Sequence, residues 1–280
     1  MKKLIVISFI LLILSIFQAV QANPTTGSTI LETSKLLATS QPLKIAVIDT
    51  GFDTASEWNK DSKPTLCDGE HKDFSRTGSI MDKHGHGTHI AGLIHKHIGN
   101  INYCLIIYKF YDPKGLHNGK AMIQSIKAAI KAKVDIINIS GGGVDPIAEE
   151  KKVIKQALDQ GIVVVAAAGN ESNNKPYYPA HYDSRIVVVG NVNVLGQRAP
   201  TSNFGPVVDG TEIGENVLSI SLGNSYKNMT GTSQSTAIAT GKIAKELYTY
   251  KLVTQLPEIF GDVNTSNYYY PNLVKYLHIK

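Results

Sequence analysis

Short, wholly apolar runs alternate along the chain with longer stretches in which apolar residues recur at helical spacing. The apolar runs predict buried strands at 43–48, 103–110, 134–139, 161–170 and 186–189. The helical spacing predicts helices at 93–97, 120–132 and 146–160. Strands without apolar–polar alternation are typical of a parallel sheet that is covered on both faces. The pattern therefore predicts the α/β class: a single three-layer domain with a mostly parallel central sheet.

The stretch at 228–241 is built from small residues and continues with helical character to residue 250. Small side chains on every face of a helix favour a buried helix that its neighbours approach closely. Gly231 and Thr232 form a turn before it, which places Ser233 in the first helical turn. Backbone N–H groups are unpaired there, and the helix dipole favours negative charge. Ser233 is therefore a candidate nucleophile, although such a serine is more often a plain helix cap.

The first 22 residues resemble a targeting segment. Lys2 and Lys3 precede the apolar run 4–17, and Val-Gln-Ala at 20–22 offers small residues for cleavage. The run is short for a membrane span, so removal is favoured over an uncleaved anchor. We expect a secreted or periplasmic protein without a stable membrane anchor after cleavage. Residues 23–41, rich in Ser, Thr and Gln, predict a short tether that precedes a domain at 42–280.

Composition places the chain among ordinary globular proteins. Of its 280 residues, 42% are hydrophobic and 18% are charged, and the net charge is +5. The lysines are scattered rather than clustered, which argues against a nucleic-acid partner. An even cysteine count in an exported chain permits a Cys67–Cys104 disulfide, while a free, buried Cys104 thiol stays an alternative.

Polar residues follow the predicted strands or open the predicted helices. Such residues meet at one edge of a parallel sheet, where ligands bind in open α/β folds. Each of them alone is also common in ordinary turns. The candidates are Asp49, His86, Ser140, Gly141, Gly142, Asn170 and Ser233.

Four segments together resemble the subtilisin-like serine proteases. They are Val-Ile-Asp-Thr-Gly at 47–51, His-Gly-Thr-His-Ile-Ala-Gly at 86–92, Ala-Ala-Ala-Gly-Asn at 166–170 and Gly-Thr-Ser at 231–233. They occur in the chain order of that family, Asp then His then Ser. The resemblance covers residues 43–250. It implies a serine endopeptidase that acts on polypeptides through an acyl-enzyme.

The resemblance also assigns the roles. Ser233 attacks the carbonyl, His86 takes its proton, and Asp49 orients the imidazole and stabilises its charged form. Asn170 donates a hydrogen bond to the developing oxyanion. The segment Ser140, Gly141 and Gly142 resembles the family's substrate-binding strand, whose backbone pairs with an extended peptide. The alternative for this segment is a glycine-rich turn.

The chain also departs from the family's pattern. Residues 93–110 are shorter than the family's usual connection, which often holds calcium, so calcium stays unproven and no cofactor is certain. The span 23–41 is too short for a full-size prodomain, which leaves unaided folding or a separate folding factor. After Ser233 the family's usual proline is missing.

A zinc site of His84, His86 and His89 is not favoured, because the spacing is unusual and no fourth ligand is evident, so no metal ligand is assigned.

Tyr177 precedes a Tyr-Pro-Ala segment that looks like the family's segment beside the primary specificity pocket. Its bulk predicts a narrow pocket that favours small side chains; the alternative is a tyrosine that faces solvent.

The sequence leaves two other functions open. One is a catalytically inactive binding protein that has kept the fold, and the other is a serine esterase or transacylase that uses the same triad.

Overall fold

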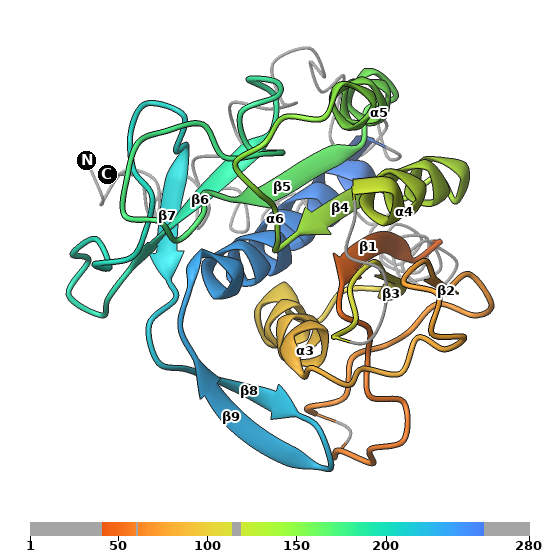
Figure 1. Ribbon diagram of the computed structural model, residues 1–280. Helices are drawn as coiled ribbons and strands as arrows, with labels where there is room; N and C mark the ends of the chain where they lie inside the picture. Colours follow the sequence, from red (N-terminus) through yellow and green to blue (C-terminus); the bar gives the residue numbers. More distant parts are fainter. Residues whose placement is uncertain (1–40, 60, 114–118, 255–280) are drawn as a thin grey trace, which may run out of the picture. The chain divides into compact units, whose positions relative to one another are not determined.

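The computed structural model describes residues 41–59, 61–113 and 119–254 of the chain (Figure 1). The predicted signal segment at 1–22 and almost all of the tether at 23–41 lie outside the described residues. The described helices and strands lie between Leu43 and Thr254.

Among the described residues, seven strands form one sheet in the order β2-β3-β1-β4-β5-β6-β7. All neighbouring pairs in this sheet run parallel, which confirms the predicted mostly parallel sheet. The strands are β1 (Leu43–Asp49), β2 (Lys72–Asp73), β3 (Tyr103–Lys109), β4 (Ile136–Ile139), β5 (Val163–Ala167), β6 (Val187–Val192) and β7 (Gly210–Ile213).

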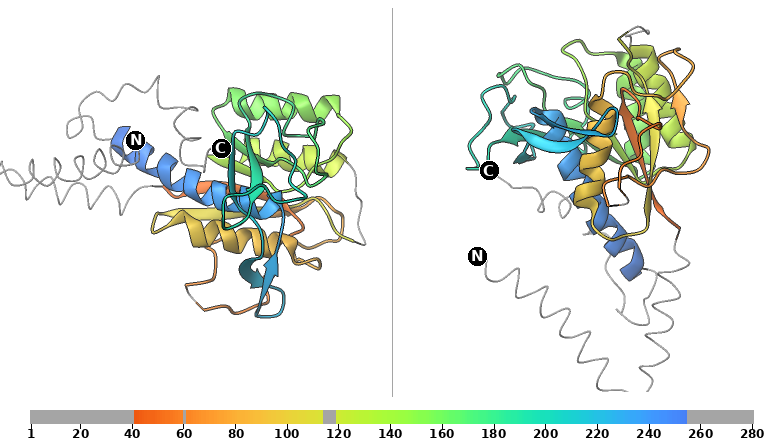
Figure 2. Two further views of the ribbon diagram at one scale, coloured as in Figure 1. Left: turned by 90° about the vertical axis from the view of Figure 1, so that its left-hand side faces the viewer. Right: turned by 90° about the horizontal axis from the view of Figure 1, so that it is seen from below.

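Helices cover both faces of the sheet, so the fold has three layers (Figures 1 and 2). α3 (His86–Ile98) and α6 (Thr232–Thr254) lie on one face, and α4 (Gly119–Lys131) and α5 (Ala148–Asp159) lie on the other. Alternate residues of one strand therefore enter different cores. In β1, Ile45 and Val47 pack with α3 and α6, whereas Ala46 and Ile48 pack with α4 and α5. Burial on both faces explains the continuous apolar strands.

The predicted helix of small residues is α6, and it lies close against α3. A β-carbon on Gly241 would lie 2.7 Å from the backbone oxygen of Ile94, closer than any side chain allows. Ala237 and Ala239 are also fully buried. Small residues are therefore needed where the two helices meet.

A two-stranded antiparallel hairpin, β8 (Val217–Ser221) and β9 (Ser225–Met229), was not predicted from the sequence. Most of β9 is exposed and polar, so it lacks an apolar run. Its position is fixed by α3 instead. His89 of α3 is fully buried, and its Nε2 lies 3.1 Å from the carbonyl oxygen of Val217 and 2.9 Å from that of Lys227.

The polar segment 57–81 does not lie wholly on the surface. It is mostly irregular, but Trp58 is buried against Phe52, with ring centroids 5.5 Å apart. Cys67 is also buried and forms a disulfide with Cys104 of β3. The alternative of a free Cys104 thiol is therefore wrong.

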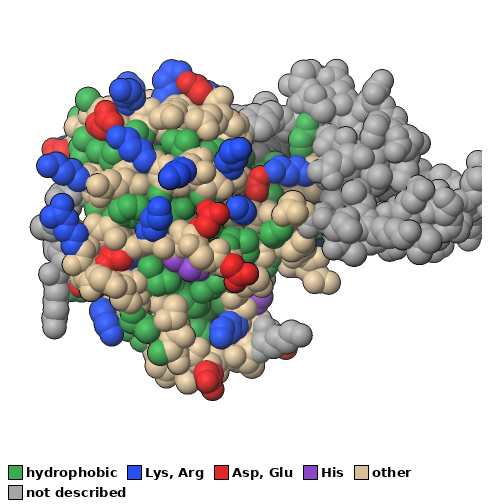
Figure 3. Space-filling model, turned by 90° about the vertical axis from the view of Figure 1, so that its right-hand side faces the viewer, with side chains coloured by type: hydrophobic (Ala, Val, Ile, Leu, Met, Phe, Trp, Pro, Cys, Tyr) green, Lys and Arg blue, Asp and Glu red, His purple; other side chains and the backbone are tan. Residues whose placement is uncertain are grey.

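Figure 3 shows one face of the molecule, on which Lys and Arg side chains are spread out with Asp and Glu between them. This distribution agrees with the scattered lysines of the sequence. Within the described ranges, no helix combines the length and the apolar character that crossing a membrane requires.

Candidate active site

The candidate residues meet at one edge of the sheet. β4 lies between β1 and β5, with Ile139 level with Ile48 on one side and with Ala166 on the other. The parallel strands therefore end together, followed by Ser140 after β4 and Asn170 after β5. α3 and α6 begin at the same edge with His86 and Thr232.

Asp49 and His86 form a close pair. Nδ1 of His86 lies 2.7 Å from Oδ1 of Asp49, which is buried and also accepts a 2.7 Å hydrogen bond from the N–H of Thr50. Oδ2 of Asp49 has no hydrogen-bond partner among the described residues. Gly87 permits this approach, since a β-carbon there would lie 2.3 Å from the carbonyl oxygen of Gly51 and 3.2 Å from Cβ of Asp49.

The pKa of His86 is raised above its ordinary value. Burial by itself lowers the pKa, but the charge of Asp49, the hydrogen bond to Asp49 and the charge of Asp82 together outweigh burial. A raised pKa means that the site stabilises the imidazolium form. This is the form that a general base takes after it has accepted a proton.

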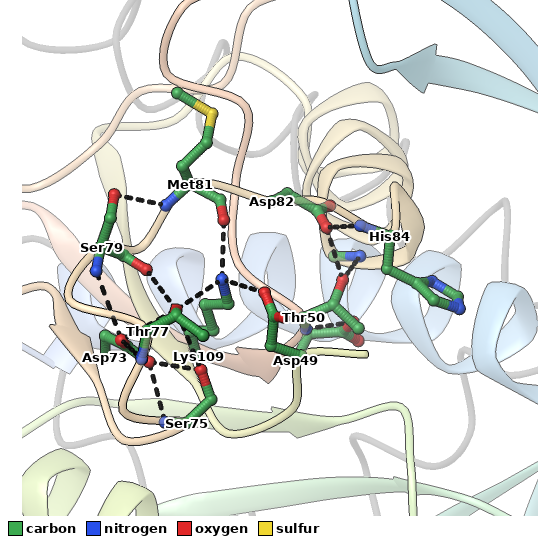
Figure 4. Close-up of polar contacts among 12 residues, drawn as sticks. Asp49, Thr50, Asp73, Ser75, Thr77, Ser79, Met81, Asp82, His84 and Lys109 are labelled. Carbon is green, nitrogen blue, oxygen red and sulfur yellow. Dashed lines mark hydrogen bonds and ion pairs between the residues drawn. The ribbon is translucent and has the colours of Figure 1, made fainter. Parts of the chain in front are cut away.

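Asp82 is a buried residue of the site that sequence reasoning missed (Figure 4). Its carboxylate accepts hydrogen bonds from the hydroxyl of Thr50 (3.0 Å), from the backbone N–H groups of His84 and Gly85, and from both the N–H and the hydroxyl of Thr88. Asp82 therefore pairs N–H groups at the N-terminus of α3, where a negative charge is stabilising. Its position four residues before the helix was the only signal in the sequence.

The loop that leads to Asp82 is held by two further charged residues (Figure 4). Lys109, at the end of β3, is buried, forms a 2.7 Å ion pair with Asp112 and donates a 2.8 Å hydrogen bond to the carbonyl oxygen of Met81. Asp73 accepts hydrogen bonds from the N–H groups of Ser75 and Thr77. The loop is thus stabilised by its own hydrogen bonds and by a buried ion pair.

Ser233 lies in the first turn of α6, as predicted, and its side chain is largely buried. Its hydroxyl donates a 2.8 Å hydrogen bond to the carbonyl oxygen of Ser140. In the part of the chain that the structure describes, no hydrogen bond joins this hydroxyl to His86. The structure thus brings Ser233 to the same edge as the Asp49–His86 pair, but with its hydroxyl turned toward β4.

Asn170 lies beside the start of α6. Its Oδ1 accepts hydrogen bonds from the backbone N–H (2.9 Å) and the hydroxyl (3.2 Å) of Thr232, which sequence reasoning treated only as a turn residue. These two donors fix the orientation of the amide. Nδ2 of Asn170 makes no hydrogen bond with the described residues and is left to donate elsewhere.

Ser140, Gly141 and Gly142 continue from β4 toward the surface. Ser140 is buried, and its hydroxyl donates a 3.2 Å hydrogen bond to the carbonyl oxygen of Ser233. Gly142 is exposed, and Gly143 forms an antiparallel bridge with Tyr178 through hydrogen bonds of 2.9 and 2.7 Å. The segment therefore presents a partly open backbone beside Ser233.

The histidines of the 84–89 segment do not converge. Nδ1 of His86 contacts Asp49, Nε2 of His89 contacts backbone carbonyls of the hairpin, and the side chain of His84 is exposed. Across the described residues, no three His, Cys, Asp or Glu side chains are grouped to hold a metal ion. The connection between α3 and β3 is only residues 99–102 and contains no acidic side chain, so it does not fit a calcium site.

Comparison with known families places this geometry. The model of the subtilase family, peptidase S8, matches residues 40–255. The chain belongs to the subtilase family. Members of this family are serine-type endopeptidases, so membership assigns the chain to this class of hydrolase. The resemblance drawn from the four segments is thereby confirmed.

Several subtilases are similar to this chain. The major intracellular serine protease of Bacillus subtilis (strain 168) is 33% identical over 218 residues, which cover 72% of this chain and 67% of that protein. The minor extracellular protease Epr of the same organism is 35% identical over 214 residues, 74% of this chain but only 32% of Epr. The chain thus spans about a third of the length of Epr.

Solved structures show the same fold. The crystal structure of a cold adapted subtilisin-like serine proteinase aligns with a TM-score of 0.64 at 24% sequence identity, over 79% of this chain and 80% of that one. At this identity the likeness is evidence for the fold alone.

Proposed function

We propose that this subtilase is a secreted serine endopeptidase in which Ser233, His86 and Asp49 form the catalytic triad. The observation that carries the proposal is the 2.7 Å contact between Nδ1 of His86 and Oδ1 of Asp49, at the edge where Ser233 opens α6. This contact holds the imidazole in the tautomer that has its proton on Nδ1, which leaves Nε2 free to accept one.

The first chemical step needs a rotation of the Ser233 side chain about its Cα–Cβ bond, so that its hydroxyl leaves Ser140 and turns to Nε2 of His86. Hydrogen bonds of this kind are often absent before substrate binds. Oγ then bonds to the peptide carbonyl carbon while its proton passes to Nε2. The carbonyl π electrons move to the oxygen.

Collapse of this intermediate breaks the peptide C–N bond, and the leaving amine takes the proton from His86. Water then repeats the sequence on the acyl-enzyme: His86 accepts the water proton, and Ser233 leaves with it. The charges of Asp49 and Asp82, which raise the pKa of His86, stabilise the imidazolium in both halves of the reaction.

Asn170 and the N–H of Ser233 are the proposed donors to the oxyanion. Thr232 holds Oδ1 of Asn170, so that Nδ2 is oriented before the substrate arrives. Donors that are oriented in advance stabilise developing charge without reorganisation. The N-terminus of α6 adds a favourable dipole at the same place.

The proposed substrate is an extended polypeptide. Its backbone pairs with Ser140, Gly141 and Gly142 as an added strand, because the two glycines have no side chains that would cover their N–H and C=O groups. An ester needs no such strand, so this segment favours peptide bonds. The disulfide Cys67–Cys104 supports an oxidising destination, although the names of the relatives include both an intracellular and an extracellular protease.

A fluorophosphonate probe tests the proposal. The purified mature protein is treated beside the variant Ser233→Ala, and the labelled residue is located by mass spectrometry. We expect labelling of the wild type at Ser233 and none of the variant. A folded wild type that takes no label would favour the inactive binding protein, and faster turnover of esters than of peptides would favour the esterase.

Secretion is tested separately. The protein is expressed in its host, the culture is fractionated, and the N-terminus of the recovered protein is sequenced. We expect the protein outside the cytoplasm with a mature N-terminus near Asn23. Recovery from the cytoplasm with residues 1–22 intact would contradict secretion but would leave the proposed catalytic mechanism unaffected.

A further inference from the structure

The ring of Tyr177 is held between two glycines of the candidate site. A β-carbon on Gly142 would lie 2.8 Å from Cε1 of Tyr177, and one on Gly169 would lie 2.9 Å from Cδ2 of the same ring. Real β-carbons do not come this close to another atom, so the ring takes part of the space that side chains at these two positions would need. The rest is taken by the carbonyl oxygen of Tyr178 at Gly142 and by the side chains of Asn203 and Glu171 at Gly169. Tyr177 is half-buried there rather than turned to solvent.

The same space lies where a substrate side chain would enter. In the proposed function, the reacting carbonyl lies between Oγ of Ser233 and the amide of Asn170. The residue that supplies this carbonyl runs along the backbone that ends at Gly142. Gly169 immediately precedes Asn170, so in this arrangement the path of that residue's side chain lies between Gly142 and Gly169, beside the ring of Tyr177.

A pocket of about 270 Å³ lies beside this ring. Its lining includes Tyr177 itself, together with Val144, Glu171, Lys175, Tyr178 and Asn203. Neither Ser233 nor Asn170 lines it, and neither do the residues at 140–142. The ring of Tyr177 therefore lies between the pocket and the space between Gly142 and Gly169, and it forms one wall of the pocket. Burial, and next the charge of Glu171, raise the pKa of Tyr177 to about 12, so its hydroxyl is neutral at physiological pH.

The backbone of Tyr177 is held independently of its ring. Its N–H donates a 3.1 Å hydrogen bond to Nδ1 of His181, and its carbonyl oxygen accepts a 3.0 Å hydrogen bond from the N–H of His181. The neighbouring Tyr178 is bridged to Gly143. A substitution of Tyr177 thus removes the ring while these backbone contacts can persist.

We propose that Tyr177 determines specificity by closing the space beside the reacting carbonyl, so that this subtilase cleaves after Gly, Ala or Ser and excludes Leu and Phe. The inference rests on the proposed function. A large side chain would have to displace the half-buried ring between Gly142 and Gly169, and a well-packed site does not accept added volume without strain. Removing the ring would connect the pocket to the space between Gly142 and Gly169, which leaves room for a large substrate side chain.

The test uses internally quenched peptides that differ only in the residue before the cleaved bond, with Ala, Leu or Phe at that position. Active sites are first counted with the fluorophosphonate probe, and mass spectrometry verifies the bond that is cut. We expect wild-type kcat/KM to be at least about tenfold higher for Ala than for Leu or Phe. In Tyr177→Ala the Leu and Phe values should rise at least about tenfold.

Tyr177→Phe is the matched control, because it keeps the ring and loses only the hydroxyl, and it should retain the wild-type ratio of Ala to Phe. A labelled wild type that prefers Leu or Phe would overturn the inference, even if Tyr177→Ala did not fold. An unchanged ratio in labelled Tyr177→Ala would do the same. A wild type that takes no label would refute the proposed function itself, so the two failures are distinguishable.

Discussion

The hydroxyl of Thr50 donates a 3.0 Å hydrogen bond to the buried carboxylate of Asp82 and accepts a 2.8 Å hydrogen bond from the N–H of Gly87. Thr50 follows Asp49 at the end of β1, and Gly87 follows His86 at the start of α3. One hydroxyl thus joins the two elements that carry the Asp–His pair. The distance between Asp49 and His86 is fixed by these contacts as well as by their own hydrogen bond.

Removing the charge of Asp82 should change the titration of His86. Asp82 is one of the charges that raise the pKa of His86, so Asp82→Asn should lower that pKa. A general base acts when neutral, so kcat/KM falls as pH drops through its pKa. The acidic limb of the pH profile of kcat/KM should therefore move to lower pH in the variant.

Asp73→Asn is the control for this change. Asp73 also accepts several hydrogen bonds in the preceding loop, but it is not among the groups that shift the pKa of His86. Its acidic limb should coincide with that of the wild type. An unmoved limb in Asp82→Asn, measured where the variant is fully folded, would contradict either the effect of Asp82 on the pKa of His86 or the assignment of His86 as the base.

Asn170→Ala should lower kcat far more than it changes KM, because in the proposed function the amide acts in the transition state. The expected loss of kcat is about 10²–10³-fold, a magnitude known for the removal of such an amide from a member of this family. The measurement is steady-state peptide hydrolysis, corrected for the number of active sites that the probe counts.

Thr232→Val tests how much the orientation of the Asn170 amide matters, separately from the hydrogen bond that the amide donates to the oxyanion. It removes the 3.2 Å hydroxyl contact to Asn170 but keeps the 2.9 Å contact from the backbone N–H, so the loss of kcat should be less than about tenfold. If Asn170→Ala stayed within about threefold of the wild type, Asn170 would not be an oxyanion donor.

The sheet could be predicted from the sequence because its central strands are buried on both faces. All residues of β5 (Val163–Ala167) are buried, and this leaves a continuous apolar run that no amphipathic helix would have. The polar residues Asp49 and Asn170, which end or follow such runs, could be proposed as candidates for the same reason. Chain order then linked them to His86 and Ser233.

Contacts between distant residues could not be predicted in this way. Asp82 and Thr50 are 32 residues apart, and Thr232 and Asn170 are 62 apart, so no local pattern marks either pair. The hairpin β8–β9 was missed because its exposed strand is polar and is held by His89 of another element. The orientation of the Ser233 hydroxyl also depends on Ser140, 93 residues away.

Reduction of the Cys67–Cys104 disulfide should destabilise the fold. The cross-link joins residues 37 positions apart, and closing a loop of that length stabilises a protein by about 4 kcal/mol in the chain-entropy model. We expect a lower melting temperature in dithiothreitol. The double variant Cys67→Ala with Cys104→Ala should melt lower than the oxidised wild type and should not respond to the reductant. Equal melting temperatures of oxidised and reduced wild type would contradict this role.

The stability of the fold should fall in mild acid, in part because of His97 at the end of α3. Burial first, and then the charges of Lys242 and Lys96, lower the pKa of His97 to about 4. In the unfolded chain its pKa is about 6.5. Between about pH 6.5 and pH 4 the unfolded state therefore binds a proton that the folded state does not, so the free energy of unfolding decreases as pH falls.

His97→Gln removes this proton uptake, so its free energy of unfolding should depend less steeply on pH across the same window. Urea unfolding from pH 7 to pH 4.5 measures both slopes, and all other titrating groups are common to the two proteins. Lys96→Gln removes only one of the two neighbouring charges, and because burial is the larger cause its effect on the slope should be smaller than that of His97→Gln. Equal slopes in the wild type and His97→Gln would show that His97 titrates alike in the folded and unfolded states.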